Sequence, residues 1–448
     1  ATLSLGYRDI EPVYQGDRRY GEDVLFYWSG NRGGSGLGSF NTRMGNVNPT
    51  GTDNGNLALG GVQDDRTFGS AFTPYNYGPS NVYQTPLETY NLYSTINYDL
   101  SDSVQVYATA LFNENTVNTL IAPSGAFGDS VTVALNHPFL SDAQRNAICA
   151  FDTDPTEGVY APKFSQAACD AAGAATGPND PNYLTYDTQL RRRNVEGGPR
   201  ISEYTARYYN FSLGFKGDIA DNYQWDVMGS YGKSDQVQVQ KGYWLKSRFR
   251  QSLLSGPDGC NDGSSGCLPV DFFGPTGSIT PEMNAFLAGG ESNVSTIFDM
   301  TQLKGSFTGN LGLKLPTASD SISFALGAEY RDYKGEQASD ILSQSGDLGG
   351  GGSASPNIQG GYDVMEGVVE VAVPLIQGRR LVDDLSLEAG YRYSDYEIKA
   401  DGASGYSTDT YKLGLSWAPS EDVRFRATFA RAVRAPNISE LFAPVITG

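Results

Sequence analysis

The sequence predicts an all-β protein, a transmembrane antiparallel β-barrel of which about eleven strands lie in this chain. Three observations lead to this fold class. Apolar and polar residues alternate with a period of two in about eleven segments, short and long connections alternate between these segments, and no run of about 18 apolar residues would form a membrane helix. In such a barrel the apolar faces contact lipid, and closure of the sheet pairs every backbone group.

The segment 321–331 shows the alternation most clearly. Phe324 and Tyr330 fall on one side of an extended chain, whereas Ser323 and Glu329 fall on the other. This pattern is typical of a strand with one apolar and one wet face. The same spacing recurs in segments 385–393, 411–417 and 423–429.

The first five expected strands are separated by the longest connections. The opening strand places Leu3, Leu5 and Tyr7 on one side, and two strand pairs follow, each joined by a short polar turn. These strands are expected near residues 2–14, 88–99, 103–116, 201–217 and 222–238.

The last six expected strands follow one another more closely. Short polar turns at 316–320 and 419–422 join two of the pairs, and the region 374–384 joins a third. These strands are expected near residues 299–314, 321–337, 360–375, 384–398, 407–418 and 422–432.

The connections indicate which end of the barrel faces outward. Bacterial barrels have short periplasmic turns and long extracellular loops, and soluble domains rarely contain unstructured loops this long. We therefore expect one partial barrel over residues 1–448, with extracellular loops at about 15–88, 117–200, 239–298 and 338–359.

Charge, cysteine spacing and histidine content limit the partners and cofactors that this chain could have. The net charge of −19 argues against a nucleic-acid partner. The four cysteines form two close pairs in polar segments, Cys149 with Cys169 and Cys260 with Cys267, which favours two loop disulfides in an oxidising compartment over free thiols. With one histidine and no CxxC spacing, neither a metal site nor a cofactor is expected.

Catalytic motifs are absent from the sequence, so we do not expect an enzyme. The single histidine, His137, precedes a proline in a loop. Asp152, Asp154 and Glu157 lack calcium-loop spacing and are interpreted as a solvated acidic loop. The basic run 191–193 is interpreted as a solvated charge cluster, with contact to lipopolysaccharide phosphate as the alternative.

Several charged residues fall on the wet faces of the expected strands, where they would line the lumen. We expect them to pair with one another or to hold a polar plug, rather than to bind substrate directly. The candidate lumen-lining residues are Glu329, Arg331, Glu388, Arg392, Arg424 and Arg426.

The segment 424–442 resembles a signature of TonB-dependent outer-membrane receptors, whose barrels carry a stretch like Phe-Arg-Ala-Pro-x-x-x-Glu-Leu-Phe. Val433 replaces the usual aromatic residue. The strand pairs in 366–396 and 411–419 are also similar to those of the family. The matching signature residues are Arg434, Ala435, Pro436, Asn437, Glu440, Leu441 and Phe442.

The resemblance implies a barrel of about 22 strands in the bacterial outer membrane, closed by a plug that contacts TonB. Its implied partners are outer-membrane lipid, lipopolysaccharide, the TonB system and an extracellular ligand. The chain has no plug before Ala1 and ends soon after the signature, so we expect a barrel segment without a plug.

The function expected from this resemblance is energised uptake of a scarce, large ligand, such as a siderophore, cobalamin, haem or oligosaccharide. A passive porin or a surface adhesin is the alternative. An outer-membrane enzyme would need a Ser/His pair, and a soluble sandwich or lectin would stay soluble without detergent.

Overall fold

The computed structural model describes most of the chain. No helix in the described part is both long and apolar enough to cross a membrane. The described residues are 1–26, 31–32, 35–39, 42–45, 52–53, 56–70, 74–261, 266–400 and 402–444.

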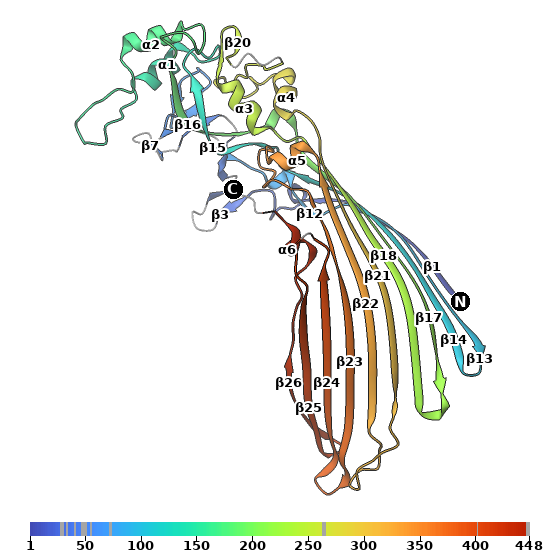
Figure 1. The fold of residues 1–448 in the computed structure, drawn as a ribbon. Helices are drawn as coiled ribbons and strands as arrows, with labels where there is room; N and C mark the ends of the chain where they lie inside the picture. The colour runs from blue at the N-terminus through green and yellow to red at the C-terminus, as the bar shows by residue number, and fades with distance from the viewer. Residues whose placement is uncertain are drawn as a thin grey trace.

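An eleven-stranded sheet dominates the molecule, and every pair of neighbouring strands is antiparallel (Figure 1). The structure thus contains each of the strands expected from the alternation, and most extend further. In spatial order the strands are β1 (Thr2–Ile10), β13 (Leu87–Ser101), β14 (Val104–Ile121), β17 (Arg200–Ile219), β18 (Tyr223–Lys241), β21 (Ser292–Asn310), β22 (Ser323–Ser339), β23 (Ile358–Arg379), β24 (Val382–Ile398), β25 (Tyr406–Ser420) and β26 (Val423–Arg431).

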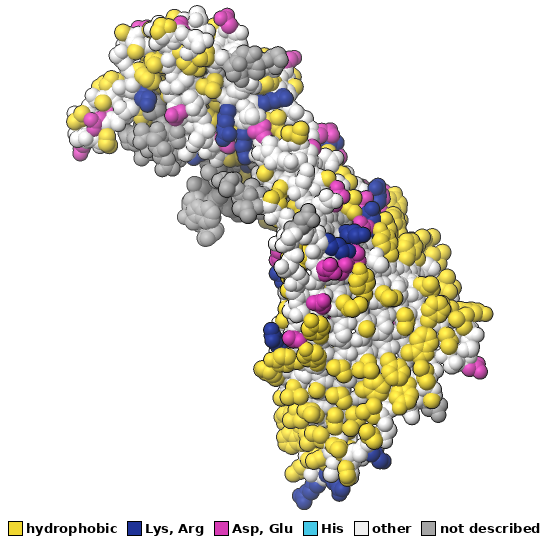
Figure 2. Space-filling model, in the orientation of Figure 1, with side chains coloured by type: hydrophobic (Ala, Val, Ile, Leu, Met, Phe, Trp, Pro, Cys, Tyr) yellow, Lys and Arg dark blue, Asp and Glu magenta, His cyan; other side chains and the backbone are white. Residues whose placement is uncertain are grey.

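The register gathers the apolar side chains of the sheet on one face. Leu326 on β22 lies opposite Phe307 on β21 and Val369 on β23, and residues directly opposite share a face. Hydrophobic side chains cover this face over the lower part of the sheet (Figure 2). Leu213 and Leu413 each expose about half of their surface, 52% and 51%. Such a face suits lipid contact, as the alternation predicts.

Short and long connections lie at opposite ends of the sheet (Figure 1). Turns of a few residues join β13 to β14, β17 to β18, β23 to β24 and β25 to β26. The long connections all leave from the other end, because the chain reverses direction from each strand of the antiparallel sheet to the next.

The long connections fold into a cap above the sheet, which comprises the described residues of 42–70, 123–199 and 243–291. Its largest sheet has the order β10-β9-β6-β16-β8-β7, with β15 also paired to β16. The cap elements are β6 (Arg43–Met44), β7 (Thr52–Asp53), β8 (Asn56–Leu57), β9 (Gly60–Val62), β10 (Phe68–Gly69), β15 (Gly125–Ala134), α1 (Asp142–Cys149), α2 (Gln166–Gly173), β16 (Thr185–Arg193), α3 (Lys246–Leu253), β19 (Ser255–Gly256), β20 (Gly259–Cys260) and α4 (Pro281–Ala288).

The cap has a hydrophobic core of its own. Ile148, Trp244, Phe249 and Phe272 are fully buried in it. Burial of such side chains contributes roughly 1.5–3 kcal/mol each, which holds together strands and helices too short to be stable alone. The sequence shows no periodicity in these short elements and does not predict this core.

Shorter elements complete the fold around the cap. α6 contacts β23. These elements are β2 (Val13–Tyr14), β3 (Leu25–Phe26), β4 (Asn31–Arg32), β5 (Ser35–Ser39), β11 (Pro74–Tyr75), β12 (Val82–Gln84), α5 (Ile341–Ser345), α6 (Ile438–Phe442) and the 3-10 turns η1 (Gln15–Asp17), η2 (Gly78–Ser80), η3 (Val195–Gly197) and η4 (Ala220–Asn222).

Three connections meet where the cap joins the sheet. The hydroxyl of Ser124 accepts from the amide of Trp244 at 2.9 Å and donates to the carbonyl of Gly349 at 2.7 Å. The amide of Gly349 in turn donates to the Trp244 carbonyl at 2.6 Å. Gly125 follows with φ +153° and lies so close to the Arg192 carbonyl that no Cβ would fit there. The cap is therefore fixed to the sheet by hydrogen bonds between separate connections, two of them through the Ser124 hydroxyl.

Candidate functional site

A charge cluster lies on the face opposite the apolar one, here called the polar face. Glu366 on β23 is 4% exposed. Its carboxylate pairs with the Arg331 guanidinium, accepts from the Ser394 hydroxyl at 2.6 Å and lies 3.8 Å from Nη1 of Arg392. A buried carboxylate needs such partners, because an unpaired buried charge is strongly disfavoured.

Arg331 links this glutamate to a second carboxylate. Its Nε lies 3.1 Å from Oε1 of Glu329, which also accepts from the Gln302 side chain at 2.6 Å. The structure thus brings together three of the residues predicted to line the lumen, Glu329, Arg331 and Arg392. It adds Glu366, which the sequence analysis did not single out because its partners lie on neighbouring strands.

The other three predicted residues lie apart from this cluster. Glu388 pairs with Lys412 on β25 at 3.0 Å. Arg426 on the edge strand β26 lies opposite Ser416 on β25, and Arg424 lies two residues before Arg426. Both arginines are exposed, and neither forms an ion pair with a residue that the structure describes.

Four tyrosines form a row beside the charge cluster. The ring centroids are 5.0 Å apart for Tyr333 and Tyr362, 6.2 Å for Tyr362 and Tyr396, and 4.7 Å for Tyr396 and Tyr406. The row crosses four neighbouring strands, and Nη1 of Arg331 donates to the Tyr333 hydroxyl at 3.2 Å. Cross-strand aromatic contacts of this kind stabilise a sheet.

A hollow of about 440 Å³ opens between the charge cluster, the tyrosine row and the chain after β26. Its size suits part of a small ligand. Its polar groups can accept and donate hydrogen bonds, and Tyr396 offers an aromatic surface. The residues that define it include Arg331, Glu366, Arg392, Ser394, Tyr396, Thr408, Thr410 and Val433.

The signature segment, residues 432–444, folds back onto the polar face. Arg434 binds Glu440 through two hydrogen bonds of 2.8 and 2.9 Å. The Asn437 amide donates to Glu440 at 2.8 Å, and the Glu440 amide donates to the Asn437 side chain at 2.8 Å. This capping box starts α6, and hydrogen bonds from Arg434 and Asn437 lower the pKa of Glu440 to about 2.

Two glycines make room for α6 on the sheet. A Cβ at Gly335 would lie 2.9 Å from Cδ1 of Ile438, and a Cβ at Gly360 would enter the ring of Phe442. Gly335 and Gly360 are directly opposite each other on β22 and β23. The remaining signature residues, Ala435, Pro436 and Leu441, complete the segment that carries these contacts.

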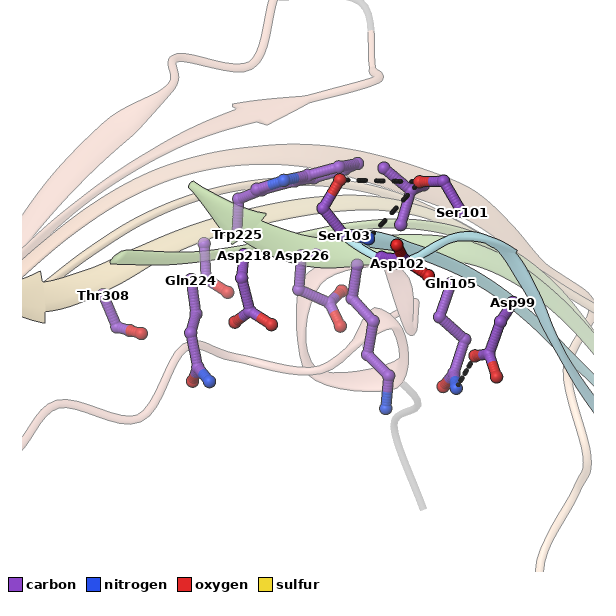
Figure 3. A pocket seen from close by; sticks show the side chains of 14 residues that line it. Asp99, Ser101, Asp102, Ser103, Gln105, Asp218, Gln224, Trp225, Asp226 and Thr308 are labelled. Atoms are coloured by element: carbon purple, nitrogen blue, oxygen red, sulfur yellow. Dashed lines mark hydrogen bonds between the residues drawn. The ribbon is translucent and has the colours of Figure 1, made fainter. Parts of the chain in front are cut away.

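A second hollow, of about 840 Å³, lies at the end of the sheet with the short turns. Gln105, Gln224 and Asp226 point into it, whereas Trp225 lies on the opposite side of its strand (Figure 3). Asp226 accepts from the Tyr107 hydroxyl at 2.7 Å. The polar face is therefore lined by amides and carboxylates near the short turns and by the charge cluster near the cap.

Comparison with known proteins identifies the family. The family model described as "TonB dependent receptor-like, beta-barrel" matches residues 151–447. The chain belongs to this family. TonB-dependent receptors are receptors and transporters of the Gram-negative outer membrane, not enzymes. No curated protein matches the chain.

Solved structures of TonB-dependent receptors are similar to this receptor chain at low identity. The FpvAI–pyocin S2 complex matches with 10% identity and a TM-score of 0.39, covering 77% of this chain and 34% of that chain. The ferric-catecholate import receptor Fiu from E. coli K12 matches with 11% identity and a TM-score of 0.35, covering 78% and 44%. The chain thus spans less than half the length of these proteins.

The basic run of the receptor, expected to be exposed, is buried in the cap. Arg191, Arg192 and Arg193 are 8%, 1% and 9% exposed. Both interpretations, a solvated cluster and a contact with lipopolysaccharide phosphate, are wrong, because β16 carries these residues into the cap. Arg192 pairs there with Glu196.

His137 is buried in the cap of the receptor. Its Nδ1 accepts from the Phe139 amide at 3.3 Å, and Nε2 lies 3.1 Å from the Ser252 carbonyl, so Nε2 carries the proton. Burial in the cap lowers the pKa of His137 to about 3, so the ring is neutral.

The cysteines and acidic residues of the cap have structural surroundings. Disulfides join Cys149 to Cys169 and Cys260 to Cys267. The Asp152 carboxylate accepts from the Asp154 and Ala161 amides, 3.1 and 3.0 Å away. The described residues contain no group of three or more His, Cys, Asp or Glu side chains that could hold a metal ion.

Proposed function

We propose that this chain forms part of an outer-membrane receptor that takes up a scarce, large ligand with energy supplied through TonB. The observation that carries the proposal is the family match over residues 151–447. The ligand classes that we consider are a siderophore, cobalamin, haem and an oligosaccharide. Outer-membrane lipid and lipopolysaccharide are the surrounding partners.

The geometry supports this function. The apolar face suits lipid contact, and the cap lies at the end with the long connections, where an extracellular ligand would arrive. We place the polar face toward the lumen, so that Glu329, Arg331, Glu388, Arg392, Arg424 and Arg426 line it. The ion pairs of Glu329 and Arg331 then fix the wall, and the hollow beside Arg392 is open to a ligand or plug.

The two edge strands of the sheet indicate how the barrel would be completed. β1 and β26 each pair with one neighbour in the sheet. An unpaired strand edge cannot face lipid, because its N–H and C=O groups would lose their hydrogen bonds. We propose that further strands complete the barrel and that a plug inside it contacts TonB.

Comparison of two deletion strains tests the function. One strain lacks this receptor, and the other lacks TonB. Both are grown on iron complexes, cobalamin, haem and oligosaccharides as limiting nutrients. Energised uptake predicts that one nutrient fails in both strains, whereas a passive porin predicts failure in the receptor deletion alone. An adhesin predicts normal growth of the receptor deletion on every nutrient, and either of the last two results would refute the proposal.

A further inference from the structure

Two arginines flank one aromatic ring where the cap meets the sheet. The guanidinium carbons of Arg193 on β16 and Arg200 on β17 lie 4.5 and 5.9 Å from the ring centroid of Phe127. Neither arginine forms an ion pair with any residue in the described part of the chain. Two like charges therefore share one partly buried location without a carboxylate.

Backbone carbonyls accept only some of the hydrogen bonds that the two guanidinium groups can donate. Nη1 of Arg193 donates to the Pro123 carbonyl at 2.7 Å. Arg200 donates from Nε to Ala122 at 2.8 Å and from Nη1 to Gly350 at 2.7 Å. The Nε of Arg193 is buried without a partner among the described residues. Each guanidinium has five donors, so both retain donors for another acceptor.

Several other arginines of this protein pair with a carboxylate, which neither Arg193 nor Arg200 does with any described residue. Arg192, next in the chain, pairs with Glu196, Arg66 pairs with Asp271 at 2.6 Å, and Arg331 pairs with Glu366. Buried charges are normally paired in this way, because transfer of an unpaired charge from water is costly. Burial, followed by the charge of Arg200, lowers the pKa of Arg193 to about 10. Among the residues that the structure describes, no carboxylate pairs with Arg193 or Arg200 to offset their charges.

Each guanidinium group also lies near a tyrosine ring. The Tyr75 ring lies 5.5 Å from the Arg193 guanidinium, and the Tyr243 ring lies 5.6 Å from that of Arg200. Aromatic faces attract cations, but they carry no net charge. An oxyanion would supply both the charge and the acceptor atoms, since guanidinium groups match carboxylate and phosphate geometry.

We propose that Arg193 and Arg200 form an anion-binding site beneath the cap, which takes the carboxylate or phosphate group of the transported ligand. This inference rests on the proposed uptake function and adds the chemical class of the ligand, an organic anion. Arg193 is buried and provides charge, whereas the half-buried Arg200 on the sheet provides the more accessible donors.

Binding to the purified full-length receptor in detergent tests the site. The probes are inorganic phosphate, benzoate and the neutral analogue benzyl alcohol, each titrated by calorimetry at low chloride. We expect phosphate or benzoate to bind and benzyl alcohol not to bind, and the stronger of the two anions indicates which group the ligand carries. Absence of binding by both anions would overturn the proposal.

Two substitutions and one control assign the binding to this pair. We expect Arg200→Gln to weaken anion binding at least tenfold and Arg200→Lys, which keeps the charge but not the planar fork, to weaken it less. Arg248→Gln is the matched control, because Arg248 also donates to a carbonyl, that of Phe286, and lies 5.3 Å from the Phe286 ring. Unchanged binding in Arg200→Gln would overturn the proposal.

A measurement on the unmodified protein avoids the effect of these substitutions on folding. Phenylglyoxal modifies accessible arginines, and peptide mapping measures the rate at each position. We expect the bound anion to slow modification of Arg200 several-fold and to leave Arg248 unchanged. Equal rates at Arg200 with and without the anion would contradict the site. Anion binding without TonB-dependent uptake would refute the uptake function alone, and the reverse result would refute this site alone.

Discussion

At the scale of single residues, Glu366 shows how the polar face holds a buried charge. The carboxylate is surrounded by Arg331, Arg392 and Ser394. Glu366→Gln removes the charge but keeps the shape, and leaves Arg331 with Glu329 alone. We expect a loss of about 1–3 kcal/mol in the free energy of unfolding, measured by urea denaturation in detergent. Glu370→Gln, an exposed position on the same strand and face, is the control, and an equal loss there would contradict the expectation.

His137 makes the cap sensitive to acid. Its pKa in the folded cap is about 3, against an ordinary value of 6.5, because burial disfavours the charged ring. The unfolded cap binds a proton below pH 6.5, whereas the folded cap does so only near pH 3. Its contribution to stability is therefore complete above pH 6.5 and is lost as the pH falls toward 3, by about 1.4 kcal/mol per pH unit.

Hydrogen exchange of the buried amides of α3, corrected for intrinsic rates, measures this loss between pH 7 and pH 4. The chain contains a single histidine, so His137→Gln should remove the steepest part of the pH dependence. If the substituted and unsubstituted caps lose stability equally over this range, acidic groups elsewhere account for it.

At the scale of elements, the signature segment depends on Gly335 and Gly360, which together form a notch that receives α6. A methyl group at Gly360 would enter the ring of Phe442. We expect Gly360→Ala to lower the stability of α6 against local opening by about 1–3 kcal/mol, as overpacking does in a core. Faster hydrogen exchange at residues 437–442 measures the change.

Gly367 on the same strand provides the control for this prediction. A Cβ there meets no other atom within 4 Å. Gly367→Ala should therefore leave the exchange of residues 437–442 unchanged. Similar exchange in the two variants would show that α6 does not depend on the notch.

The elements also show what the sequence could predict. Each long strand repeats with a period of two, so the eleven strands and the two faces follow from the pattern alone. The cap strands are two to ten residues long, and helices such as α1 are held by a capping box and packing. Elements this short show no reliable period, so the cap core could not be predicted.

The candidate site was predicted in part for the same reason. Glu329, Arg331 and Arg392 could be assigned to the polar face from alternation. Their partner Glu366 depends on the register between strands, which the sequence does not reveal. Arg193 was assigned to a solvated run, because a row of three arginines gives no sign that β16 pairs inside a folded cap.

At the scale of the whole molecule, one chain follows two opposite rules of burial. The cap buries Trp244, Phe249 and Phe272, as a soluble domain does. The sheet instead exposes its apolar side chains on one face and buries Glu366 on the other. Average composition mixes these regions, so the hydrophobic fraction of 39% describes neither. Lipid is the solvent that makes the second arrangement stable.

This arrangement predicts very different costs for the same substitution at adjacent positions. Leu213 lies on the apolar face of β17, and Ser212 lies on the polar face. Leu213→Arg should cost about 2–4 kcal/mol if the residue is near the middle of the bilayer, whereas Ser212→Arg would remain in contact with water. Folding of the full-length receptor into lipid vesicles, followed by denaturant titration, measures both. Equal costs at the two positions would mean that the apolar face of the sheet does not contact lipid.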